Sequence, residues 1–126
     1  MGKRILVVDD EQDIVKSVAD MLTHNGYEVV QALDGNEALL KAREHPADLV
    51  ILDLILPKLD GWRVCQTLKK DAHYRKVPFI LLSALLHTDS TGGDETLDAT
   101  DAYMAKPFQL DRLLAKVQAM LGEKSS

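Results

Sequence analysis

Residues 48–57, with the sequence DLVILDLILP, decide the fold that we expect for this chain. Four consecutive apolar residues, 49–52, precede Asp53. A short apolar run that is rich in β-branched residues and ends at a polar residue is typical of a strand buried on both faces of a parallel sheet. Asp53 then lies at the carboxyl end of that strand, the edge where open parallel sheets bind ligands. Its carboxylate is either a cap for the following loop or a reactive group.

The composition is that of an ordinary soluble domain. The chain has 126 residues, 46% of them hydrophobic and 28% charged, and this length favours one domain with its own core. The net charge of −5 argues against a nucleic-acid surface, which needs a basic patch. The single cysteine, Cys65, rules out a disulfide framework and is expected in the core. There is neither a long apolar run nor a signal-peptide pattern, so we expect a cytoplasmic protein without a membrane partner.

Apolar runs that suit buried strands alternate with segments of helical periodicity. Strands are predicted over residues 5–8, 28–32, 47–53, 79–82 and 102–105. Helices are predicted over residues 14–22, 37–44, 61–68 and 110–121, where apolar residues recur every three or four positions. Strands that alternate with helices through short loops predict the α/β class, a parallel sheet covered by helices on both faces.

Residues 85–100, LLHTDSTGGDETLDAT, fit this alternation least well. The two adjacent glycines, Gly92 and Gly93, would each cost a helix about 1 kcal/mol relative to alanine. We therefore expect a mobile loop, followed by one or two helical turns near residues 94–100.

Polar side chains stand at the carboxyl ends of four predicted strands. They are Asp9 with Asp10, then Asp53, Ser83 and Lys106. All strand ends of this kind lie at one edge of a parallel sheet, so neighbouring first and third strands would gather three carboxylates. Such a cluster is unfavourable unless a cation compensates its charge, and the two candidates are Lys106 and a divalent metal ion.

This combination of groups suits phosphoryl transfer. An all-oxygen site fits Mg²⁺ rather than zinc, and Mg²⁺ binds phosphate oxygens readily. A carboxylate nucleophile, a metal ion, an ammonium group and a hydroxyl are what transfer of a phosphoryl group onto Asp53 requires. Simpler roles stay open: Asp9 or Asp10 as a helix cap, Ser83 as a strand-end hydroxyl and Lys106 as a surface lysine.

Four motifs in order resemble the receiver domain of two-component response regulators. They are VVDDE at 7–11, LDLILPKLDG at 52–61, LLSA at 81–84 and YMAKPF at 103–108. Each motif alone is common, but the four together cover nearly the whole chain. The resemblance implies a flavodoxin-like (βα)5 doubly wound sandwich with a five-stranded sheet in the order 2-1-3-4-5. Residues 1–122 would form this receiver domain, and residues 123–126 a flexible tail or the start of a linker.

The resemblance also implies roles for the acidic residues. Asp53 would accept a phosphoryl group from a sensor histidine kinase or a phosphotransfer protein. Asp10 and Asp53 would hold Mg²⁺ directly and Asp9 mostly through water, with the main-chain carbonyl of Ile55 as a further ligand. Lys106 would pair with the phosphoryl oxygens.

Further residues match the switching parts of the family. Ser83 matches the switch hydroxyl, and Tyr103 matches the switch aromatic that turns inward when the hydroxyl moves. Tyr103 as a static, half-buried strand residue is the alternative. The Lys106–Pro107 peptide bond would be cis.

Two departures from the family pattern lead to hypotheses. Ile55 and Leu85 stand two residues after Asp53 and Ser83, where the family often has polar groups that influence attack by water, so we expect a long-lived aspartyl phosphate.

The family reads out phosphorylation, and can form a homodimer, at the face of the fourth helix, fifth strand and fifth helix. The poor helical pattern of residues 85–100 suggests ordering of that region on activation or partner binding.

We therefore predict a signalling switch that is no enzyme beyond promoting its own phosphorylation and dephosphorylation, and that binds no nucleic acid itself. The main alternative is a pseudo-receiver, an interaction module that works without phosphorylation. A magnesium-dependent phosphatase would want an acid where Ile55 stands. A flavodoxin-like cofactor binder is disfavoured by the acidic sheet edge.

Overall fold

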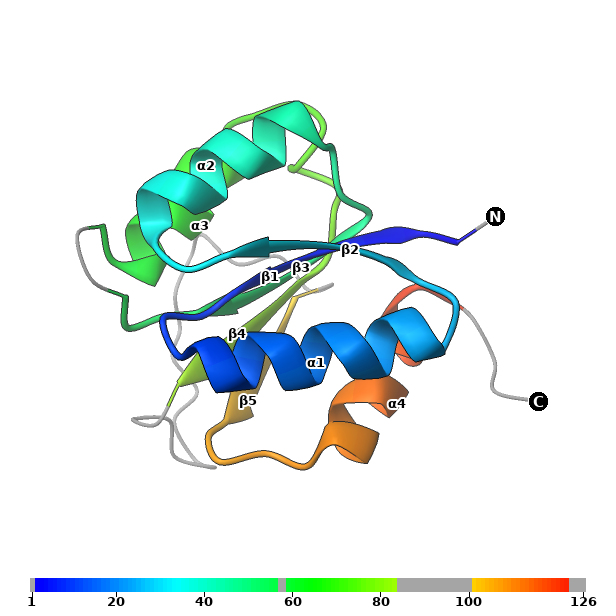
Figure 1. Ribbon diagram of the computed structural model, residues 1–126. Helices are drawn as coiled ribbons and strands as arrows, with labels where there is room; N and C mark the ends of the chain where they lie inside the picture. Colours follow the sequence, from blue (N-terminus) through cyan, green and yellow to red (C-terminus); the bar gives the residue numbers. More distant parts are fainter. Residues whose placement is uncertain (1, 57–58, 84–100, 123–126) are drawn as a thin grey trace.

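The structure is a computed structural model, and it describes residues 2–56, 59–83 and 101–122. Five strands form one parallel sheet in the order β2-β1-β3-β4-β5 (Figure 1). The strands are β1 (Arg4–Val8), β2 (Glu28–Ala32), β3 (Leu49–Asp53), β4 (Phe79–Ser83) and β5 (Ala102–Ala105). The helices are α1 (Gln12–His24), α2 (Gly35–Glu44), α3 (Gly61–Lys69) and α4 (Leu110–Met120), the last of which corresponds to the final predicted helix. The flavodoxin-like fold and its strand order are confirmed; the expectations for residues 85–100 and 123–126 lie outside the described residues.

Helices cover both faces of the sheet. Figure 1 shows α2 and α3 on one side and α1 and α4 on the other. Successive residues of a strand point to opposite faces, so Leu6 joins the core cluster under α2 and α3, whereas Ile5 joins the cluster under α1 and α4. All residues of β3 and β4 are buried, as the unbroken apolar runs predict. No helix in the described ranges has the length and apolar character to cross a membrane.

Side-chain caps set the starts of two helices. The Asp34 side chain accepts a hydrogen bond from the main-chain N–H of Glu37 (2.8 Å), and the Glu37 side chain accepts one from the N–H of Leu33 (2.7 Å). This pair of bonds resembles a capping box, except that Glu37 reaches the residue before the cap, and it begins α2 at residue 35, two residues earlier than predicted. The side chain of Asp60 caps α3, because it accepts a hydrogen bond from the N–H of Arg63 (3.0 Å).

The third strand begins at Leu49, two residues later than predicted. The main-chain N–H of Ala47 donates to the hydroxyl of Tyr74 (2.9 Å), and this hydroxyl donates to the main-chain oxygen of Ala42 (2.6 Å). Tyr74 thus supplies the partner that a neighbouring strand would otherwise provide to residue 47.

The start of α3 lies directly against the end of β3. The main-chain N–H of Gly61 donates to the main-chain oxygen of Leu54 (3.0 Å). A Cβ atom at Gly61 would overlap the main-chain oxygen of Asp53, so only glycine permits this close approach. The position of α3 is therefore tied to the carboxyl end of β3.

A buried ion pair joins α3 to the last two strands. The carboxylate of Asp101 accepts from Lys69 Nζ (3.1 Å) and from the main-chain N–H of Phe79 (2.9 Å), and its side chain is fully buried. Lys69 also donates to the main-chain oxygen of Val77 (2.8 Å) and lies 4.4 Å from the centre of the Phe79 ring. Buried charges are tolerated only when paired, so these contacts fix the C-terminal end of α3 to the amino ends of β4 and β5.

The Asp101→Ala substitution tests this ion pair. It would leave the Lys69 ammonium and the Phe79 N–H without their shared acceptor, and we expect the free energy of unfolding to fall by about 3 kcal/mol. The matched control is Lys70→Met, at the exposed neighbouring lysine, which should change it by less than about 0.5 kcal/mol. Urea unfolding measures both, and equally small effects of the two substitutions would contradict the assignment.

Candidate functional site

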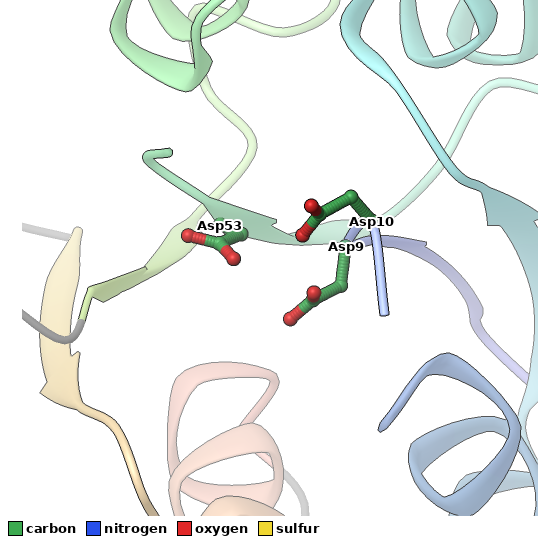
Figure 2. Close-up of side chains that lie close together, drawn as sticks. All are labelled: Asp9, Asp10 and Asp53. Atoms are coloured by element: carbon green, nitrogen blue, oxygen red, sulfur yellow. The ribbon is translucent and has the colours of Figure 1, made fainter. Parts of the chain in front are cut away.

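Three carboxylates meet at the carboxyl edge of the sheet. Asp9 and Asp10 directly follow β1, Asp53 ends β3, and these two strands are hydrogen-bonded neighbours. Each of the three residues offers one carboxylate oxygen, and these three oxygens lie within 4.8 Å of one another. Figure 2 shows the three side chains grouped in this way. The sequence pattern predicted this cluster on the condition that the first and third strands are neighbours, and the strand order meets that condition.

Lys106 reaches the same cluster from the end of β5. Its Nζ lies 2.9 Å from Asp9 Oδ2 and 2.9 Å from Asp53 Oδ2. Asp9 and Asp53 are only 0% and 4% exposed, whereas Asp10 is exposed to solvent. The carboxylate of Glu11 lies 3.4 Å from the same ammonium group. Glu11 stands in the acidic run 9–11, but no sequence pattern predicted a role for it.

Main-chain hydrogen bonds hold both buried carboxylates in place. Asp9 Oδ1 accepts from the N–H of Glu11 (3.0 Å), and Asp53 Oδ1 accepts from the N–H of Ile55 (2.9 Å). These are the local turns that aspartate favours, with the acceptor two residues before the donor. In both residues Oδ1 is fixed by the main chain and Oδ2 contacts Lys106. The N-cap of α1 is Glu11, which makes no side-chain cap bond.

Burial and the neighbouring charges shift the pKa values of Asp9 and Lys106. Burial raises the pKa of Asp9 above its ordinary value; hydrogen bonds from Glu11 and Lys106 oppose this shift, and the nearby charge of Asp53 adds to it. Burial by itself would lower the pKa of Lys106. The hydrogen bonds and charges of Asp53 and Asp9 outweigh that effect and hold the Lys106 pKa well above its ordinary value. Lys106 therefore remains a cation throughout the physiological range.

Ser83 lies on the strand between Asp53 and Lys106. It is the buried last residue of β4, and its main-chain oxygen accepts from the N–H of Lys106 (3.1 Å). The peptide bond between Lys106 and Pro107 is cis, the configuration that the family resemblance implies. Ser83 thus lies at the predicted edge, between the strand of the acidic residue and that of the cation.

Tyr103 and Ile55 are the remaining predicted residues that lie in the described ranges. Tyr103 lies on β5, packs against the core cluster under α2 and α3, and has a buried hydroxyl oxygen. Ile55 follows β3, and its side chain is 50% exposed. Leu85, the second apolar residue in the expected shield, lies outside the described residues.

The donor set of the site fits a magnesium ion. Asp9, Asp10 and Asp53 offer only carboxylate oxygens, and within residues 2–56, 59–83 and 101–122 neither histidine nor cysteine belongs to this cluster. Mg²⁺ prefers oxygen ligands and retains several waters, which the exposure of Asp10 allows. The side chains present are therefore compatible with the predicted metal.

Known proteins with similar sequences show to which family this chain is related. Residues 5–118 match the model of the response regulator receiver domain. The alkaline phosphatase synthesis transcriptional regulatory protein PhoP of Bacillus subtilis is 41% identical, over 96% of this chain and 49% of its own length. The chain therefore spans about half the length of the curated relatives it matches.

Two solved structures share the fold. The chemotaxis response regulator CheY4 of Vibrio cholerae is 29% identical, with a TM-score of 0.86 over 95% of this chain and 99% of its own. The receiver domain of sensor histidine kinase PA1611 from Pseudomonas aeruginosa is 29% identical, with a TM-score of 0.83 over 98% of this chain and 100% of its own. That structure is described as having a magnesium ion coordinated in its active site cleft.

The raised pKa of Asp9 predicts a pH-dependent stability of the metal-free chain. Folded Asp9 binds its proton more tightly than unfolded Asp9. This tighter proton binding stabilises the folded chain most below the ordinary pKa of 3.8. The stabilisation is lost as the pH rises through the raised pKa of folded Asp9. Asparagine resembles the protonated carboxyl group, so Asp9→Asn should be more stable than the wild type at about pH 7, by a margin that shrinks toward about pH 4.

Chemical unfolding in the presence of a chelator, repeated at several pH values, measures this margin. The control is Asp20→Asn, at an exposed position of α1, whose difference from the wild type should not depend on pH in this way. An Asp9→Asn variant that is less stable than the wild type at neutral pH would contradict the prediction.

Proposed function

This chain belongs to the response regulator receiver domain family, and we propose that it is a phosphorylation-controlled signalling switch. Asp53 accepts a phosphoryl group from a sensor histidine kinase or a phosphotransfer protein. The observation that supports this best is the placement of the Lys106 ammonium 2.9 Å from the carboxylates of both Asp9 and Asp53. A nucleophile and a cation are thus adjacent at the edge where open parallel sheets bind ligands.

The proposed step is a direct displacement at phosphorus. An oxygen of the Asp53 carboxylate forms a bond to phosphorus while the phosphorus–nitrogen bond of a phosphohistidine breaks. The N–H of Ile55 fixes the orientation of the attacking carboxylate (2.9 Å). Lys106 stabilises the negative charge on the phosphoryl oxygens, a contribution that is large when the cation is already in place.

Magnesium is the proposed cofactor. Asp9, Asp10, Asp53 and the main-chain carbonyl of Ile55 would hold it, Asp9 mostly through water. When bound, Mg²⁺ supplies positive charge to the transferring phosphoryl group. The donor chemistry of the carboxylate cluster supports this proposal, as does the magnesium ion in the active site cleft of the PA1611 receiver domain.

Ser83 and Tyr103 are the residues that we propose to change conformation on phosphorylation. We propose that the Ser83 hydroxyl moves toward the phosphoryl group and that Tyr103 turns inward with it. The face formed by β5 and α4 then changes, and it controls a homodimer contact or a partner domain. Apart from promoting phosphorylation and dephosphorylation of Asp53, this activity is not enzymatic.

Phosphorylation of Asp53 can be tested with a small phosphodonor. With Mg²⁺ and acetyl phosphate, the wild type should gain one phosphoryl group by intact-protein mass spectrometry, and Asp53→Asn should gain none. Asp20→Asn, at an exposed aspartate of α1, is the matched control and should react like the wild type. A chelator should abolish the reaction. A wild type that never reacts would favour the pseudo-receiver, and an adduct that persists in Asp53→Asn would move the acceptor elsewhere.

The lifetime of the aspartyl phosphate tests the role of Ile55. Its half-exposed apolar side chain follows Asp53 closely, and we propose that it hinders the approach of water. Ile55→Asn should therefore speed the decay of the phosphorylated protein by about tenfold, or ~1.4 kcal/mol in the barrier, whereas Ile55→Val should not. The decay is followed after removal of the donor. Loss of the wild-type phosphoryl group within seconds would refute the shielding.

A further inference from the structure

We propose that Trp62 is a positioning residue for the switch: it holds the ring of Tyr103 in the inward orientation and so favours the conformation that Asp53 phosphorylation stabilises. This inference rests on the function proposed above. It assigns a role to a tryptophan that is not one of the polar residues at the strand ends, and it makes the contact between the two aromatic rings part of the switching equilibrium.

The two rings form an edge-to-face pair. Their centres are 6.2 Å apart and their planes are inclined by 62°, which is the geometry that aromatic pairs prefer. Trp62 and Tyr103 are both partly buried and both pack against the core cluster under α2 and α3. The hydroxyl oxygen of Tyr103 is buried. The Tyr103 side chain is therefore directed toward Trp62 on α3, the orientation that the proposed switch favours.

One side of this pair is fixed to the phosphoacceptor by the main chain. Trp62 is the second residue of α3 and directly follows Gly61, whose N–H donates to the main-chain oxygen of Leu54 (3.0 Å). Gly61 has no space for a side chain against the main chain of Asp53. Trp62 therefore cannot shift far relative to Asp53 without breaking this close approach.

The other side of the pair is fixed to the phosphoacceptor by an ion pair. Tyr103 and Lys106 belong to the same short stretch of β5 and its end, and Lys106 Nζ lies 2.9 Å from Asp53 Oδ2. The contact between Trp62 and Tyr103 thus closes a ring of contacts that begins and ends at Asp53. A change at Asp53 that moves Lys106 or α3 must alter the aromatic contact.

The energy of the contact sets the size of the effect. An edge-to-face pair contributes an interaction that corresponds to a factor of about two to twelve in an equilibrium constant. A contact made in only one of two conformations shifts the equilibrium between them by its full factor. By linkage, any ligand that favours the inward conformation binds more tightly by up to the same factor. Loss of Trp62 should therefore weaken binding of a phosphoryl analogue at Asp53.

Calorimetric titration with fluoroberyllate in the presence of Mg²⁺ tests this. Trp62→Leu and Tyr103→Leu should each weaken fluoroberyllate binding by about two- to twelvefold. The double variant should bind no more weakly than Tyr103→Leu alone, since both substitutions remove the same contact. Trp62→Phe retains an aromatic ring and should restore most of the affinity. Unchanged affinity in Trp62→Leu, or strictly additive losses in the double variant, would overturn the proposal.

A control separates positioning from ordinary packing. Leu39, on α2, is also partly buried against the same core cluster, and Leu39→Ala should lower the unfolding midpoint without changing the fluoroberyllate affinity. A purely structural Trp62 would behave in the same way. Urea unfolding of every variant shows how much stability each one retains.

Fluorescence gives a second readout that keeps Trp62 in place. Trp62 is the only tryptophan of the chain, so its emission should change when fluoroberyllate binds to the wild type. Tyr103→Leu should lose most of this change while Asp53 can still be phosphorylated, and an unchanged response in Tyr103→Leu would overturn the proposal even if Trp62→Leu did not fold. A wild type that binds no fluoroberyllate would instead refute the phosphorylation of Asp53 itself.

Discussion

The contact of one ammonium group with two buried carboxylates is the constraint on which the remaining structure depends. Asp9 and Asp53 are brought together by the pairing of β1 with β3, and two like charges at this separation repel strongly where water is largely excluded. Lys106 lies 2.9 Å from both of them. The sheet can therefore keep an acidic edge because β5 delivers a cation to it.

The fold holds the acidic residues of the site on its most rigid elements. The residues of β3 and β4 are entirely buried, so the strand ends have little freedom to move. Asp9 and Asp53 are held further by N–H groups of the residues two positions later. The carboxylate of Asp53, the proposed nucleophile, is thus oriented by its own loop, which is the preorganisation that charge stabilisation requires.

Sequence reasoning succeeded where local patterns determine the structure and missed what depends on contacts between distant residues. Apolar runs located all five strands, and the polar residues at their ends located Asp53 and Lys106. The starts of α2 and β3 differed from prediction because they depend on the side chains of Glu37 and Tyr74. The ion pair of Lys69 with Asp101 joins residues 32 positions apart, and no pattern within either segment indicates its partner.

That ion pair gives β5 different attachments at its two ends. The amino end of the strand is anchored through Asp101, which contacts both Lys69 and the main chain of β4, while the carboxyl end is attached through Lys106 to Asp53. Four residues of strand span about 13 Å. Because β5 is also paired with β4 along its length, a displacement of Lys106 would strain this edge pairing most beside Asp53 and least at the end that Asp101 anchors.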